Sequence, residues 1–185
     1  MRLFVAIDFS EEIKHDLLGV STELVRQASA GRVIPEENYH LTLVFIGEIG
    51  KGGYSGGGEQ LRSIEEVIAG VCRRKALEAF TIRLAGIGSF KSVKGHNWWV
   101  GVEEHPILTG LATSLTDELC ERGFAIERRN FKPHITIGRS IVCKQPIELY
   151  APERDIVVDG ISLMRSDRKQ DRQVYTEIFS HRFGV

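Results

Sequence analysis

The segment 131–139 constrains the fold most strongly, because its alternating polar and β-branched residues predict a strand that is entered through Pro133. Successive side chains of a strand point to opposite faces. His134 and Thr136 therefore share one face, while Ile135 and Ile137 share the other. The apolar pair predicts burial against a core, and the polar face is then free to line a site.

The same pattern occurs a second time, half a chain length earlier, where His40 and Thr42 alternate with Leu41 and Leu43. Each copy follows a predicted helix and a short loop. This repetition predicts two similar lobes related by an approximate two-fold axis, with one motif strand of each lobe facing a shared central cleft. We expect residues 1–185 to form a single bilobal domain.

The hydrophobic periodicities predict eight strands interspersed with three helices, with mostly antiparallel connections. This order is typical of an α+β fold with antiparallel-sheet lobes and helices outside, and not of an alternating doubly wound sheet. The predicted strands cover 2–8, 39–46, 80–87, 98–102, 124–127, 133–139, 156–164 and 174–179, and the predicted helices cover 11–30, 61–75 and 106–122.

Charge is balanced overall but uneven along the chain. The 185 residues carry a formal net charge of −1, so no global field marks a nucleic-acid-binding protein. Between Glu121 and Lys144, however, six basic residues stand against two acids. This segment suits an anionic ligand, although a solvated basic turn explains Arg128 and Arg129 equally well.

The three cysteines, Cys72, Cys120 and Cys143, are widely spaced, and their pattern indicates neither a disulfide framework nor a zinc site. The N-terminal residues lack the pattern of a signal peptide, and no apolar run reaches the length of a membrane span. We therefore expect a reduced, cytoplasmic setting, no membrane association and a monomer.

A glycine-rich segment at 50–58 raises the alternative of a phosphate-binding loop. A P-loop requires a lysine and a hydroxyl residue directly after its last glycine. Here Lys51 precedes the glycine cluster, so a flexible surface loop is the better interpretation.

Two His-x-Thr strands that face each other provide the groups needed for in-line displacement at phosphorus. Histidine titrates near pH ~6.5, so a neutral His could act as base and a protonated one as acid. The hydroxyls of Thr42 and Thr136 could bind the non-bridging phosphate oxygens. Arg139 could add positive charge, but its strand parity differs from that of His134, so its reach depends on a twist or a bulge.

Other chemistries fit the residues less well. A single His-x-Thr on a strand could be purely structural, but two equivalent copies weaken that interpretation. The motifs bring no carboxylate or third histidine for a zinc site, so we expect catalysis without a metal or another cofactor. No nucleophile motif for serine or cysteine chemistry is present. The other histidines, His15, His96, His105 and His181, have surface or local structural settings.

The two motifs resemble those of the 2H phosphoesterases, and the chain is most similar to the RNA 2',3'-cyclic phosphodiesterases, also called 2'-5' RNA ligases. The similarity includes the opening strand 1–7, the segment 40–48 (HLTL-x-F-x-GE), the segment 133–139 (PHITIGR) and the late strand 161–166. It covers essentially the whole chain, and the glycine-rich loop departs from the usual pattern.

This resemblance implies a bilobal fold and the opening of a 2',3'-cyclic phosphate at an RNA 3' end to leave a 2'-phosphate. It also implies that His40 protonates the departing 3' oxygen and that His134 activates water, with Thr42, Thr136 and Arg139 on the phosphate. Basic residues at 128–132 could contact the RNA backbone. Three alternatives remain: 2'-5' ligation at the same site, action on a small cyclic nucleotide or 2'-5' oligoadenylate, and a non-catalytic RNA- or nucleotide-binding module.

Overall fold

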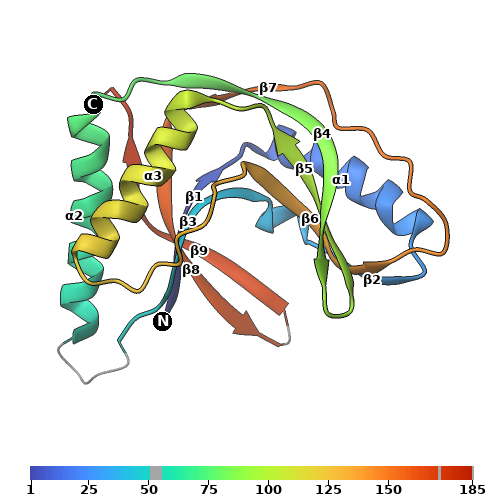
Figure 1. The fold of residues 1–185 in the computed structure, drawn as a ribbon, viewed down its shortest axis with the longest axis horizontal. Helices are drawn as coiled ribbons and strands as arrows, with labels where there is room; N and C mark the ends of the chain where they lie inside the picture. Colours follow the sequence, from blue (N-terminus) through green and yellow to red (C-terminus); the bar gives the residue numbers. More distant parts are fainter. Residues whose placement is uncertain (51–55, 171, 185) are drawn as a thin grey trace.

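A computed structural model describes residues 1–50, 56–170 and 172–184, and its nine strands form one antiparallel sheet (Figure 1). The α+β class predicted from the sequence is confirmed. In chain order the elements are β1 (Arg2–Asp8), α1 (Glu11–Gln27), β2 (Ala30–Val33), η1 (Glu36–Asn38), β3 (His40–Glu48), α2 (Gly56–Arg74), β4 (Phe80–Ser92), β5 (Gly95–Val102), α3 (Pro106–Glu121), β6 (His134–Val142), β7 (Asp155–Val158), β8 (Gly160–Lys169) and β9 (Arg172–Arg182).

The sheet consists of two four-stranded halves that meet at the motif strands. The strand order is β7-β4-β5-β6-β3-β1-β8-β9, and β2 pairs in addition with β6. β6 is thus the inner strand of one half, and β3 is the inner strand of the other. The two predicted lobes are therefore halves of one continuous sheet, joined where the two motif strands pair.

Each half is built around the same strand–helix–strand unit, and the helices cross over between the halves. β1, α1 and β3 form one unit, and β5, α3 and β6 form the other. α1 packs against β6 and β2 of the opposite half, whereas α3 packs against β3. α2 lies beside α3 and also contacts β9 (Figure 1). This exchange of helices ties the halves together and gives the pseudo-symmetry that the repeated motif predicts.

α1 and α3 begin where their first residues predict, whereas α2 begins at Gly56, before the predicted start at residue 61. The side chain of Ser10 accepts a hydrogen bond from the Ile13 N–H at 3.5 Å, and Glu11 and Glu12 occupy the first turn of α1. Acidic side chains in the first turn stabilise the helix, because they interact favourably with the positive end of the helix dipole. α3 begins with Pro106 in its first turn, where a missing N–H costs nothing.

The prediction of a strand at 124–127 is wrong. Phe124 and Ile126 pack against the core from an irregular segment, and the Ile126 N–H donates to the Phe124 carbonyl oxygen at 2.9 Å. That local turn breaks the extended backbone, although the apolar residues still alternate. β2, by contrast, is a four-residue strand that the sequence did not predict.

The strand predicted at 156–164 is in fact two strands, because the chain moves from one half of the sheet to the other near Asp159. β7 pairs with β4, and β8 pairs with β1 and β9. β4 pairs with β5 and β8 pairs with β9 as two hairpins, whose strands are longer than the predicted ranges. The hairpins β4–β5 and β8–β9 project on the same side of the molecule (Figure 1).

The glycine-rich segment lies largely outside the described residues, of which only Gly50 and 56–58 belong to it; the latter open α2. None of the described helices has the length and apolar character needed to cross a membrane.

Candidate active site

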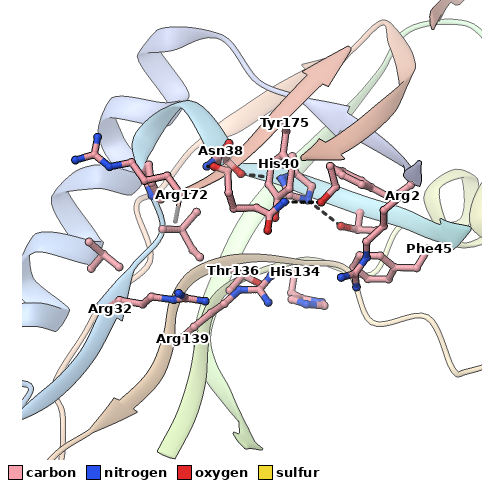
Figure 2. Close-up of a pocket in the computed structure, with 17 residues that line it drawn as sticks. Arg2, Arg32, Asn38, His40, Phe45, His134, Thr136, Arg139, Arg172 and Tyr175 are labelled. Atoms are coloured by element: carbon pink, nitrogen blue, oxygen red, sulfur yellow. Dashed lines mark hydrogen bonds between the residues drawn. The ribbon is translucent and has the colours of Figure 1, made fainter. Parts of the chain in front are cut away.

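The two motif strands meet at one bridge, where Leu41 of β3 pairs with Ile135 of β6. Both of these side chains are fully buried. The residues on either side of the bridge face the opposite way, so His40, Thr42, His134 and Thr136 line one cleft of about 290 Å³. Figure 2 shows the two histidines on facing sides of this cleft.

A β-bulge in each motif strand changes which residues follow the motif on the cleft face. Trp98 and Trp99 pair with Gly138 and Thr136, so Ile137 is an extra residue on β6. A bulge reverses the parity of the residues beyond it. Arg139 therefore lies on the same face as His134 and lines the cleft, as the conditional prediction from strand parity required.

The equivalent bulge on β3 is at Leu43, because Val5 and Ala6 pair with Val44 and Thr42. Phe45 thereby occupies on β3 the position that Arg139 occupies on β6, and it also lines the cleft. The two strands have the same backbone pattern but place different side chains, one aromatic and one cationic, at the equivalent positions.

Each motif histidine is oriented by the carbonyl group two residues before it. His40 Nδ1 lies 2.7 Å from the Asn38 carbonyl oxygen, and His134 Nδ1 lies 2.7 Å from that of Lys132. A carbonyl oxygen only accepts, so Nδ1 of both rings carries the proton, and Nε2 is the atom that exchanges protons. His40 Nε2 lies 3.0 Å from Thr42 Oγ1, whose hydroxyl donates to the neutral ring.

Aromatic rings fix the two imidazoles from the sides. Each histidine ring contacts two aromatic rings, which restricts its rotation and removes water from around it. The contacts are those of His40 with Phe4 and Tyr175 and of His134 with Phe90 and Trp99, at centroid separations of 4.8, 5.0, 5.1 and 6.0 Å, respectively.

Burial lowers the pKa of both motif histidines. The pKa of His40 falls to about 4, chiefly through burial; the Asn38 carbonyl and the Asp8 carboxylate oppose this shift, and Arg139 adds to it. Burial also lowers the pKa of His134. The sequence allowed one neutral and one protonated histidine near neutral pH. Burial instead favours two neutral rings, because desolvation disfavours the charged form of each.

Positive charge surrounds the two histidines. Among the described residues, no carboxylate lines the cleft, and the arginines that line it form no ion pair. These arginines come from four different strands, β1, β2, β6 and β9, and only one of them belongs to a motif strand. They are Arg2, Arg32, Arg139 and Arg172 (Figure 2).

The sequence missed Arg2, Arg32 and Arg172, since nothing near them in the chain marks a site. It pointed instead to Arg128 and Arg129, which do not line the cleft. Their guanidinium groups each lie 2.5 Å from a carboxylate oxygen, of Asp117 and Glu127, respectively.

The remaining histidines lie outside the cleft lining. His15 lies 3.5 Å from a carboxylate oxygen of Glu36, and His96 lies in β5, with Nδ1 3.0 Å from Ser89 Oγ. His105 precedes α3, and His181 lies in β9. Within 1–50, 56–170 and 172–184, no three histidine, cysteine or acidic side chains gather as ligands for a metal ion.

The family model of the 2'-5' RNA ligase superfamily matches residues 22–170. The chain belongs to this superfamily. Its resemblance to the 2H phosphoesterases, predicted from the paired motifs, is thereby confirmed.

Curated relatives and a solved structure agree with this assignment. An RNA 2',3'-cyclic phosphodiesterase from Thermotoga maritima is 36% identical over 141 residues, which are 75% of this chain and 70% of the relative. Another from Archaeoglobus fulgidus is 35% identical over 140 residues, or 75% and 72% of the two chains. The structure of E. coli LigT complexed with 3'-AMP superposes with a TM-score of 0.82 at 25% identity, covering 100% of this chain and 98% of that one.

Proposed function

We propose that this protein is an RNA 2',3'-cyclic phosphodiesterase that opens the cyclic phosphate at an RNA 3' end and leaves a 2'-phosphomonoester. The observation that carries the proposal is a pair of histidines, one from each of the two central strands, that line the same cleft. In each ring Nδ1 contacts a backbone carbonyl, so Nε2 is the atom that exchanges protons. Both relatives from Thermotoga maritima and Archaeoglobus fulgidus are named RNA 2',3'-cyclic phosphodiesterase. One chain holds both histidines, so we expect a monomer to be active.

His134 is the general base of this mechanism. Its Nδ1–H is held by the Lys132 carbonyl, so Nε2 is free to accept a proton. As a water oxygen bonds to phosphorus, its proton passes to His134 Nε2. The lowered pKa of His134 keeps the ring neutral, and the Lys132 ammonium group contributes to this lowering.

His40 is the general acid, and the bound substrate favours its protonated form. A negatively charged phosphate within a few ångströms favours the imidazolium form and so offsets the burial that lowers the pKa of His40. The bond between phosphorus and the 3' oxygen breaks as His40 Nε2 gives that oxygen its proton. The 2' oxygen keeps the phosphate, and solvent then restores both rings to their starting protonation states.

Hydroxyl and guanidinium groups hold the phosphate. The hydroxyls of Thr42 and Thr136 donate to non-bridging oxygens, and the Thr42 hydroxyl is released from His40 Nε2 once that atom carries a proton. Arg139 supplies fixed positive charge from beyond the bulge. Arginine charge at this cleft supports a metal-independent reaction.

The test is incubation of the purified protein, with EDTA, and an oligoribonucleotide ending in a 2',3'-cyclic phosphate, followed by identification of the product. We expect a 2'-phosphate end. No turnover by the wild-type protein would overturn the hydrolase, and activity lost only with EDTA would overturn the metal-independent mechanism. A second oligonucleotide with a 5'-hydroxyl end in the mixture detects 2'-5' ligation at the same site.

Histidine variants test the assignment of the pair. His40→Ala and His134→Ala should each lower turnover by about two to four orders of magnitude, the usual contribution of a positioned acid or base. His15→Ala is the control, because this exposed histidine lies outside the cleft. Near-wild-type activity in either motif variant would exclude the paired-histidine mechanism, provided that circular dichroism shows a folded protein.

A further inference from the structure

The cleft carries more positive charge than one phosphate requires. Arg139 is the arginine assigned to the reacting phosphate, yet Arg2, Arg32 and Arg172 line the same cleft. None of the three forms an ion pair within the described part of the chain. An arginine placed at a cleft and left without a carboxylate partner is suited to an anionic ligand.

Arg32 is directly paired with Arg139 across the β2–β6 strand pair. Like charges opposite each other on neighbouring strands destabilise a sheet, so this pairing has a cost that a bound anion would remove. Hydrogen bonds at both ends of β2 nonetheless hold this strand against β6. The Ser29 N–H donates to the Val142 carbonyl at 2.8 Å, and the Ile34 N–H donates to the Ile137 carbonyl at 2.9 Å.

Arg172, the first residue of β9, lies at the same end of the cleft as Arg32 (Figure 2). The neighbouring Gln173 carbonyl accepts a hydrogen bond from Asn38 Nδ2 at 2.8 Å, which ties the start of β9 to the segment before His40. Arg139, Arg32 and Arg172 therefore form a series of cations on one side of the histidines. Arg2 reaches the cleft on the other side, in the view of Figure 2.

We propose that Arg32 and Arg172 form a binding site for a second phosphate, that of the phosphodiester preceding the terminal nucleotide. This proposal rests on the proposed function, because it assumes that the reacting cyclic phosphate lies between His40 and His134. Its consequence is a preference for the ends of RNA strands over mononucleotides. The recognised group is the charge of the linkage, so the site does not read the base.

Three substrates test the proposal: a nucleoside 2',3'-cyclic phosphate, a dinucleotide ending in the same group, and that dinucleotide with an uncharged methylphosphonate linkage. For the wild-type protein we expect kcat/KM on the charged dinucleotide to exceed that on the other two by about tenfold to a hundredfold, the worth of one charge-assisted phosphate contact. Equal values for the charged and uncharged dinucleotides would overturn the proposal.

The ratio of kcat/KM for the charged to the uncharged dinucleotide assigns the residues. Arg32→Gln should bring this ratio close to one, mainly through a higher KM, and Arg172→Gln should lower it. Arg139→Gln should lower kcat/KM on all three substrates by a similar factor. Arg2→Gln should leave the ratio as in the wild type, and so should Arg129→Gln, whose arginine pairs with Glu127. If Arg32→Gln lowers all rates equally, Arg32 acts on the reacting phosphate and the second site is excluded.

Binding measurements keep this test separate from the hydrolysis test. The probes are a dinucleotide and a mononucleotide that each end in a 2'-phosphate, titrated against the wild-type and Arg32→Gln proteins. Tighter binding of the charged dinucleotide, lost in Arg32→Gln, supports the second phosphate site even if hydrolysis is absent. Equal affinities for the two probes would overturn it.

Discussion

Phe45 on β3 and Arg139 on β6 occupy equivalent positions, each five residues after its motif histidine and just beyond a β-bulge. The two halves of the sheet thus share a backbone plan but not a chemistry. The bulge on β6 brings a cation to the cleft, whereas the bulge on β3 brings an aromatic ring that is 61% exposed. A symmetric scaffold thereby becomes a site with two different ends.

Arg139→Gln should lower kcat by about 10²–10³, the usual effect of removing one group that stabilises transition-state charge. Its thermal stability should be unchanged or slightly higher, because the like charge opposite Arg32 is removed. Steady-state kinetics and a thermal melt measure the two effects. Wild-type kcat in this variant would show that Arg139 does not act on the reacting phosphate.

The dependence of kcat/KM on pH should be bell-shaped, with both limbs below pH 6.5 and one of them near pH 4. The mechanism needs one protonated and one neutral histidine in the free enzyme, and both pKa values are lowered there, that of His40 to about 4. Below both values the two rings are protonated, and above both they are neutral, so the active form peaks between them.

The alkaline limb of kcat should lie at higher pH than that of kcat/KM, because bound phosphate raises the pKa of His40 in the complex. Initial rates from pH 4 to pH 9 at low and at saturating substrate separate the two profiles. A kcat/KM that keeps rising up to pH 8 would contradict this protonation scheme.

Acid should destabilise the protein through His40 before most carboxylates titrate. The unfolded chain binds a proton on this histidine near pH 6.5, whereas the folded chain does so only near pH 4. The stability contributed by neutral His40 is therefore fully present above pH 6.5, and it is lost as the pH drops towards 4. The loss amounts to about 3 kcal/mol in the free energy of unfolding.

Urea unfolding at several pH values between 4 and 8 measures this dependence. In His40→Asn the loss over this range should be smaller, because an amide does not titrate but can still donate to the Asn38 carbonyl. His134 contributes in the same direction, since its pKa is also lowered. His15→Asn, at an exposed position, should keep the wild-type dependence. The same slope in His40→Asn and wild type would exclude His40 as the source.

Local sequence patterns predicted the helices and strands whose formation depends mainly on residues near them in the chain. Ser10 and the apolar spacing of Ile13, Leu17 and Leu24 were sufficient for α1, because capping and periodicity depend on residues within a few turns. The motif strands followed from alternation in the same way. The repeat predicted that both strands face one cleft, because two equivalent units favour a pseudo-symmetric arrangement, but it did not predict that they pair with each other at the Leu41–Ile135 bridge.

The rest of the site depends on register between distant strands, which no local pattern contains. The position of Arg139 depends on an extra residue opposite Trp98 and Trp99 of β5. Arg32 reaches the cleft only because β2 pairs with β6. The split of the predicted 156–164 strand has the same cause: both of its parts are rich in apolar residues, but they have partners in opposite halves of the sheet.

Gly31→Ala should destabilise the protein, because this glycine lets β2 approach β6. Its φ is +116°, and a Cβ atom there would lie 2.7 Å from the backbone of both Ser140 and Ile141. Strain of this backbone type alone costs about 1–3 kcal/mol, and the contact with backbone atoms adds to it. The substitution should also displace Arg32, its neighbour, and so lower the preference for a charged dinucleotide.

Gly19→Ala is the matched control. Gly19 lies within α1, and nothing lies within 4 Å of a Cβ atom built there. Alanine should therefore stabilise the protein by about 0.5–1 kcal/mol through helix propensity. Urea unfolding of both variants, with the dinucleotide ratio measured on each, compares the two sites. An alanine at 31 that leaves both stability and substrate preference unchanged would mean that β2 does not need its close approach to β6 to place Arg32.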